Sequence, residues 1–86
     1  MISNHKIRTI IVDDEAIARK GVTALIQLHF KDKIEIVDFA DSVDSAIKAI
    51  EQHSPDLVLL DIQLKNENSF DILKRISSKN FKIIFI

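Results

Sequence analysis

The sequence predicts an α/β fold: a doubly wound parallel β-sheet with helices on both faces. Short apolar, β-branched segments alternate with segments whose apolar residues recur at helical spacing. Together they give the order βαβαβαβ, and strands that alternate with helices form parallel sheets with right-handed crossovers. The chain has 86 residues, so a (β/α) barrel, which takes roughly 250, is excluded.

The first strand is predicted from Ile7 to Val12 and the first helix from Glu15 to about His29. The strand is apolar and β-branched apart from Arg8 and Thr9. The helix carries one face of regularly spaced residues: Ala18, Val22, Leu25, Ile26 and His29. Gly21 lies inside this helix, where glycine costs up to about 1 kcal/mol relative to alanine. We expect close packing to explain it.

The second strand is predicted from Ile34 to Ala40. Charged residues alternate with its apolar ones, which suits a strand at the edge of the sheet. The second helix follows Asp41 or Ser42, either of which can cap it, and ends before Pro55. Its apolar positions lie on one helical face: Val43, Ala46, Ile47 and Ile50.

The run from Leu57 to Leu60 is continuously apolar, so we expect a buried parallel strand there. A polar loop is predicted from Lys65 to Asn68, and a third helix begins after Asn68 or Ser69. This helix is expected to bury Phe70, Leu73 and Ile76 and to carry Lys74, Arg75 and Lys79 near its C-terminal end. The fourth strand is predicted from Lys82 to Ile86.

Composition narrows the class of protein. Hydrophobic residues make up 47% and charged residues 29% of the chain, which is ordinary for a single globular domain and excludes intrinsic disorder. The net charge of −1 offers no basic excess for binding nucleic acid. The chain has no cysteine and no apolar run near the roughly 20 residues of a membrane span. We therefore expect a soluble, cytoplasmic protein with no disulfide framework.

Acidic residues follow two of the predicted strands. Asp13, Asp14 and Glu15 come directly after the first strand, and Asp61 comes directly after the third. The carboxyl ends of parallel strands share one sheet edge, so Asp13, Asp14 and Asp61 converge if these strands are neighbours. Converging carboxylates repel, and a divalent cation with oxygen ligands, Mg²⁺ or Mn²⁺, would relieve the repulsion.

A carboxylate beside such a cation can also act as a nucleophile and form an acyl phosphate. The geometry therefore suits phosphorylation of one aspartate. A simpler alternative stays open at this point: these acidic residues could only keep loops soluble, with Asp14 capping the first helix.

Two motifs resemble those of response-regulator receiver domains. The segment from Ile10 to Arg19 resembles the start of the family, and the segment from Pro55 to Leu64 resembles its phospho-acceptor strand. The segment from Asp38 to Ser42 is also similar. Asp61-Ile62-Gln63-Leu64, together with the strand at Lys82 to Ile86, most resembles receivers that precede a LytTR-type DNA-binding output domain.

The resemblance implies a role for each matching residue. Asp61 corresponds to the phosphorylated aspartate, and Asp14 to the carboxylate that binds Mg²⁺ directly. Asp13 corresponds to its companion, which acts through water, and Gln63 to the position whose backbone carbonyl completes the metal site. The implied fold is flavodoxin-like with strand order 2-1-3-4-5, which makes the first and third strands neighbours.

The chain departs from the family pattern in two places. A proline and a glycine are usual where this chain has Lys65 and Ser69, so we expect a less rigid loop. The Thr or Ser that usually follows the fourth strand would come directly after Ile86. We therefore expect residues 1–86 to be the N-terminal portion of a receiver domain, without its fifth strand and last two helices. The fourth strand would then be an exposed edge, prone to dimerisation or strand exchange.

Three functional hypotheses follow. The first is a receiver that takes a phosphoryl group from a sensor histidine kinase onto Asp61 and controls an attached output; it is not a conventional turnover enzyme. The second is a non-phosphorylated interaction or dimerisation module. The third is a phosphohydrolase with an aspartate nucleophile, which needs a second aspartate two residues on. Gln63 and Glu15 occupy those places after Asp61 and Asp13, so this hypothesis ranks low.

Overall fold

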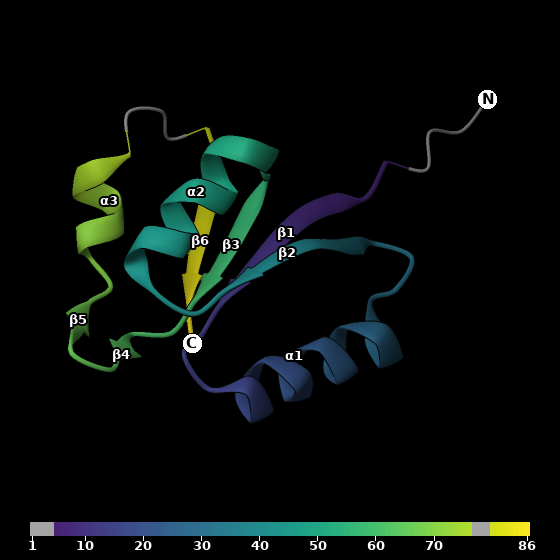
Figure 1. The fold of residues 1–86 in the computed structure, drawn as a ribbon. Coiled ribbons are helices and arrows are strands. Elements are labelled where there is room, and N and C mark those ends of the chain that lie inside the picture. Colours follow the sequence, from purple (N-terminus) through teal and green to yellow (C-terminus); the bar gives the residue numbers. More distant parts are fainter. Residues whose placement is uncertain (1–4, 77–79) are drawn as a thin grey trace.

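Four parallel strands form the central sheet of the computed structural model, which describes residues 5–76 and 80–86 (Figure 1). The strands are β1 (Ile7–Val12), β2 (Ile34–Ala40), β3 (Leu57–Leu60) and β6 (Lys82–Phe85). Their order across the sheet is β2-β1-β3-β6. The predicted strands are confirmed to within one residue, the second strand lies at an edge, and β1 and β3 are neighbours as the site requires.

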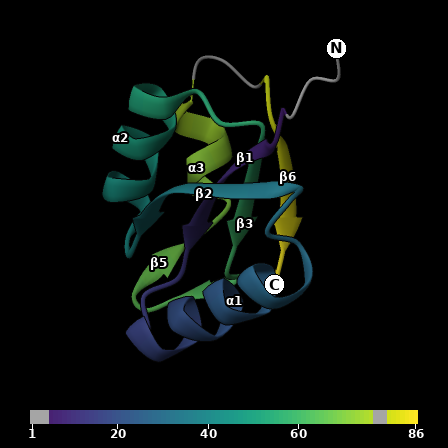
Figure 2. The same cartoon turned by 90° about the vertical axis from the view of Figure 1, so that its right-hand side faces the viewer.

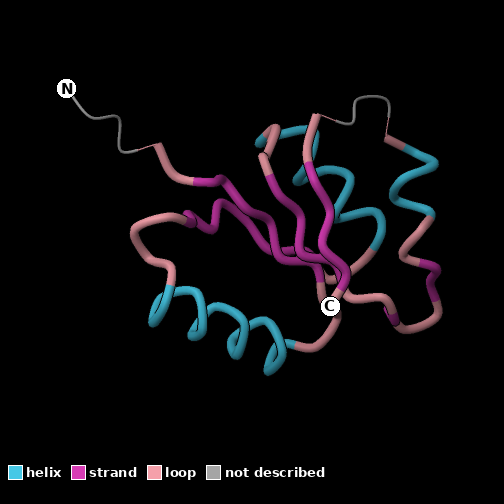
Figure 3. Tube along the Cα trace, turned by 180° about the vertical axis from the view of Figure 1, so that it is seen from behind, coloured by secondary structure: helices cyan, strands magenta, loops and turns pink. Residues whose placement is uncertain are grey.

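Helices cover both faces of this sheet. Helix α1 (Ala16–His29) lies on one face, and α2 (Val43–His53) and α3 (Asp71–Arg75) lie together on the other (Figures 2 and 3). Ser42 caps α2: its side chain accepts a hydrogen bond from the Ser45 N–H, while the Ser45 hydroxyl accepts one from the Ser42 N–H. Within the part of the chain that the structure describes, no helix is long and apolar enough to cross a membrane.

The main core lies between the sheet and helices α2 and α3. Its buried side chains come from β1, β3, α2 and the segment around α3, and include Ile10, Val12, Val58, Leu60, Val43, Ala46, Ile47, Ile50, Ile72 and Ile76. The predicted apolar face of the second helix is thereby confirmed. The opposite face is more thinly covered, because α1 buries only Ile26. Leu25 and His29, expected on the inner face of that helix, are exposed.

Two elements after β3 differ from the expectation. The polar loop contains a short antiparallel hairpin, β4 (Gln63–Leu64) and β5 (Glu67–Asn68). It turns through Asn66, whose φ of 59° is a left-handed conformation that asparagine tolerates. The third helix has five residues and buries Ile72. Of the three side chains expected to be buried, Ile76 is buried directly after the helix, Leu73 is partly buried and Phe70 is 47% exposed. Neither Asn68 nor Ser69 is its N-cap, and Lys79 lies outside the described residues.

Gly21 contradicts the expectation of close packing. A Cβ placed on it would meet no heavy atom within 4 Å. Gly21→Ala should therefore stabilise α1 without a clash and raise the free energy of unfolding by up to ~1 kcal/mol. Urea unfolding followed by circular dichroism measures this. The reciprocal change in the same helix, Ala24→Gly, should lower stability by a similar amount, and a loss of stability in Gly21→Ala would contradict the prediction.

Candidate functional site

The register of β1 with β3 brings the acidic residues of the two strands to one edge of the sheet. Val12 pairs with Leu60, so Asp13 and Asp61 each come next along neighbouring parallel strands. The ladder continues past the strand ends: the Asp61 N–H donates to the Val12 carbonyl at 2.9 Å, and the Asp13 N–H donates to the Ala40 carbonyl at 3.0 Å. These backbone bonds hold both aspartates at the carboxyl ends of the strands, where ligands bind in open α/β sheets.

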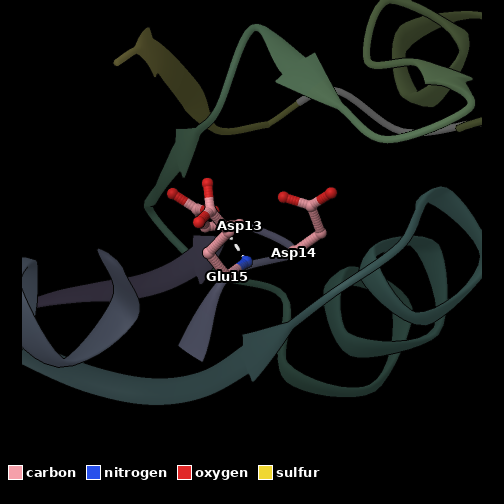
Figure 4. A group of neighbouring side chains, drawn as sticks. All are labelled: Asp13, Asp14 and Glu15. Carbon is pink, nitrogen blue, oxygen red and sulfur yellow. Dashed lines mark hydrogen bonds between the residues drawn. The ribbon is translucent and has the colours of Figure 1, made fainter. Parts of the chain in front are cut away.

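Carboxylate oxygens of Asp13, Asp14 and Glu15 lie within 4.8 Å of one another (Figure 4). Asp13 is buried, Asp14 is partly buried and Glu15 is exposed. The sequence predicted Asp13 and Asp14 as metal-site residues, and Glu15 was not among the predicted ligands. Asp61 does not belong to the group of described residues that meets this spacing. It is nevertheless close enough for its charge to raise the pKa of Asp13.

Hydrogen bonds orient three of these side chains. Asp13 Oδ1 accepts from the Glu15 N–H at 3.0 Å, and Asp61 Oδ1 accepts from the Gln63 N–H at 3.0 Å. Each aspartate thus bonds the backbone two residues ahead, a common turn geometry for this residue type. The backbone N–H of Lys65 donates to Asp14 Oδ2 at 2.7 Å. Helix α1 has Glu15 as N-cap with no side-chain cap bond, so the simpler role for Asp14 as a helix cap is not seen.

Gln63 joins Asp61 to the hairpin. Its N–H bonds Asp61 and it begins β4, with an exposed side chain. The predicted role of this residue lies in its backbone carbonyl, and that role stays a prediction.

The closeness of several carboxylates makes the site favourable for a cation. Burial raises the pKa of Asp13 above its ordinary value of 3.8, and the neighbouring charges of Asp61, Asp14 and Glu15 raise this pKa further, while the hydrogen bond from Glu15 lowers it. The ligand atoms that these side chains offer to a metal are all oxygens, the ligand type that Mg²⁺ prefers. The residues present therefore fit a hard divalent cation at the sheet edge.

The fold and this acidic edge agree with a family comparison. Residues 9–86 match the family model described as the response regulator receiver domain. The chain belongs to this family, and is thus a receiver module of two-component signalling. The β2-β1-β3-β6 order corresponds to the first four strands of the flavodoxin-like sheet expected from the sequence.

Individual relatives agree with this assignment. The chain is 40% identical over 70 residues to the sensory transduction protein LytT of Bacillus subtilis, covering 81% of this chain and 28% of that protein. It is 35% identical over 74 residues to a protein-glutamate methylesterase/protein-glutamine glutaminase of Koribacter versatilis, covering 85% of this chain and 20% of that one. The solved response regulator domain of Thermotoga maritima CheB superposes with a TM-score of 0.81 at 26% identity, covering 94% of this chain and 60% of that one. The chain thus spans less than a third of the length of these two curated relatives, LytT and the methylesterase.

Asp13→Asn should stabilise the protein without metal at pH 7. Because the fold raises the pKa of Asp13, the stability associated with its proton is complete below pH 3.8 and is lost as pH rises through the folded pKa. The asparagine keeps an acceptor for the Glu15 N–H but carries no charge. Urea unfolding in a chelator, at pH 7 and below pH 3.8, measures the difference between variant and wild type.

The gain in stability should shrink toward zero at the lower pH. Asp32→Asn, an exposed aspartate in the turn between α1 and β2, is the control and should show no comparable gain. A less stable Asp13→Asn protein at pH 7 would contradict the prediction that burial and the neighbouring carboxylates destabilise the charged form of Asp13.

Proposed function

We propose that this chain is the phospho-acceptor module of a response regulator and receives a phosphoryl group on Asp61 from a histidine kinase. One observation carries the proposal: Asp13 and Asp14, which follow β1, and Asp61, which follows β3, lie at the same edge of the sheet. In the transfer, an Asp61 carboxylate oxygen forms a bond to phosphorus as the bond from phosphorus to the histidine nitrogen breaks. The products are an acyl phosphate and a free imidazole.

Each residue of the site has a distinct part in this proposal. Asp14, Asp61 and the backbone carbonyl of Gln63 would hold Mg²⁺, and Asp13 would contact it through water. When bound, the ion supplies positive charge that offsets repulsion between the carboxylates and the incoming phosphoryl group. The hydrogen bond from the Gln63 N–H holds one oxygen of Asp61, which leaves the other to approach phosphorus.

The output controlled by this module lies outside the segment. We propose an output in transcription through a LytTR-type DNA-binding domain. The resemblance of Asp61-Ile62-Gln63-Leu64 to receivers that precede such a domain supports it, together with the identity to LytT, a protein named for sensory transduction. The methylesterase relative carries a similar segment in a protein with a different printed activity. The receiver segment is therefore compatible with more than one output, and we propose the transcriptional one because of the greater identity to LytT.

Asp61→Asn should abolish phosphorylation. Incubation of wild-type protein with acetyl phosphate and Mg²⁺ should add one phosphoryl group, visible by intact-mass spectrometry, because a small acyl phosphate can replace the kinase as donor. The variant should show no gain, and neither should wild-type protein in a chelator. Asp56→Asn, which changes an exposed aspartate at the opposite end of the same strand, is the control and should be phosphorylated like wild type.

An unmodified wild-type protein that also fails to bind Mg²⁺ would contradict the proposal. It would favour the alternative of a non-phosphorylated interaction module, which needs no metal.

We further propose that β6 pairs with a second copy when residues 1–86 are studied by themselves. In the described sheet β6 is an outer strand, with Ile84 51% and Phe85 37% exposed. An apolar outer strand is a template for pairing, and a lysine on it opposes association. Ile84→Lys should therefore reduce the mass measured by size-exclusion chromatography with light scattering. Ile17→Lys, the same change on exposed α1, is the control, and a wild-type protein that stays monomeric would contradict the proposal.

A further inference from the structure

The β4–β5 hairpin is bonded to two other parts of the molecule, and a third hydrogen bond closes its base. Its turn residue Lys65 donates its N–H to Asp14 at the end of β1, at 2.7 Å. Glu67 Oε1 accepts the N–H of Val43, the first residue of α2, at 3.1 Å. After the hairpin, the buried Ser69 hydroxyl donates to the Ile62 carbonyl at 2.7 Å. The hairpin thus bridges the acidic edge and the N-terminus of α2.

The contact of Glu67 with the N-terminus of α2 is favourable for two reasons. The first N–H groups of a helix have no partner inside the helix. The Ser42 side chain takes the Ser45 N–H, and Glu67 takes that of Val43 from a position 24 residues away. A negative charge near a helix N-terminus is also stabilising. Because α2 packs its inner face into the main core, it is a rigid anchor for the hairpin.

The contact of Lys65 with Asp14 depends on the residue type at position 65. Proline, usual at this place in receivers, has no backbone N–H and could not make this bond. Lys65 supplies that N–H and holds one carboxylate oxygen of Asp14, so the other oxygen is available to a cation. A hydrogen bond of this kind orients a metal-binding carboxylate before the metal arrives.

The hairpin needs these ties because it is small. Each of its strands has two residues, joined by two ladder positions, and three of those four residues are exposed. An isolated two-stranded hairpin is marginally stable in water. Loss of the hydrogen bond between Glu67 and Val43 should therefore make the whole hairpin more mobile, including the Lys65 N–H that donates to Asp14.

We propose that Glu67 is a positioning residue for the acidic site: it anchors the β4–β5 hairpin to α2, so that the Lys65 N–H holds the Asp14 carboxylate in place. The anchoring is independent of the proposed function. Its consequence for Mg²⁺ affinity rests on the proposed function, because it requires Asp14 to be a ligand.

Amide hydrogen exchange in the absence of metal tests the anchoring directly. In Glu67→Ala, the amides of both Val43 and Lys65 should exchange about five-fold faster than in wild type, as expected for loss of a hydrogen bond. Ser45→Ala is the matched control: it removes a capping hydroxyl from the same helix end and touches no hairpin residue. It should leave the exchange of Lys65 unchanged.

Glu67→Gln keeps an acceptor oxygen and should restore slow exchange at Lys65. Glu67 is exposed, so neither substitution leaves a cavity, and circular dichroism confirms that each variant is folded. Exchange that increases at Val43 but not at Lys65 in Glu67→Ala would overturn the proposal, because Glu67 would then only cap α2. Equal losses in Glu67→Gln and Glu67→Ala would overturn the hydrogen bond as its basis.

Calorimetric titration with Mg²⁺ alone measures the consequence for the site. The Mg²⁺ dissociation constant should rise about ten-fold in Glu67→Ala and stay near the wild-type value in Ser45→Ala. Equal affinity in wild type and Glu67→Ala would overturn the positioning role. Wild-type protein that binds no Mg²⁺ would contradict the proposed function instead, while the exchange measurement would still decide whether Glu67 anchors the hairpin.

Discussion

The pairing of β1 with β3 is the constraint on which the site depends. These strands are separated in sequence by a strand and two helices, yet their parallel register sets Val12 beside Leu60 and so sets Asp13 and Asp61 at one edge. The apolar side chains of the two strands bury into one core, and their burial is the favourable term that offsets crowding of the carboxylates. Burial first, and then the neighbouring carboxylates, raise the pKa of Asp13.

The loop after β3 shows how the chain accommodates residues that differ from the family pattern. We expected Lys65 and Ser69, in place of proline and glycine, to reduce rigidity. Both residues make hydrogen bonds: Lys65 donates its N–H to Asp14, and Ser69 donates its buried hydroxyl to Ile62. Proline has no N–H for the first bond and glycine has no hydroxyl for the second, so both bonds depend on the residues of this chain. The rigidity of the loop stays a prediction.

The two faces of the sheet are unequal. Helices α2 and α3 close the main core on one face, whereas α1 buries only Ile26 on the other and leaves Leu25 and Leu28 exposed. The acidic edge lies between these faces: Asp13 follows β1 and leads into α1, while the hairpin connects the same edge to α2. The site is thus contacted from both faces: the Arg19 guanidinium of α1 donates to the Asp13 carbonyl at 2.7 Å, and the hairpin links Asp14 to α2.

Local sequence patterns determined the four strands of the central sheet, the first two helices and the acidic residues of this protein. The apolar runs at Ile7–Val12 and Leu57–Leu60 and the helical spacing after Ser42 were sufficient, because strand and helix periodicity is a property of neighbouring residues. Asp13, Asp14 and Asp61 were found because they directly follow strands. Tertiary structure alone decided the role of Glu67, the position of Glu15 in the carboxylate group and the exposure of α1. Those features arise from contacts and coverage between distant segments, which no local pattern records.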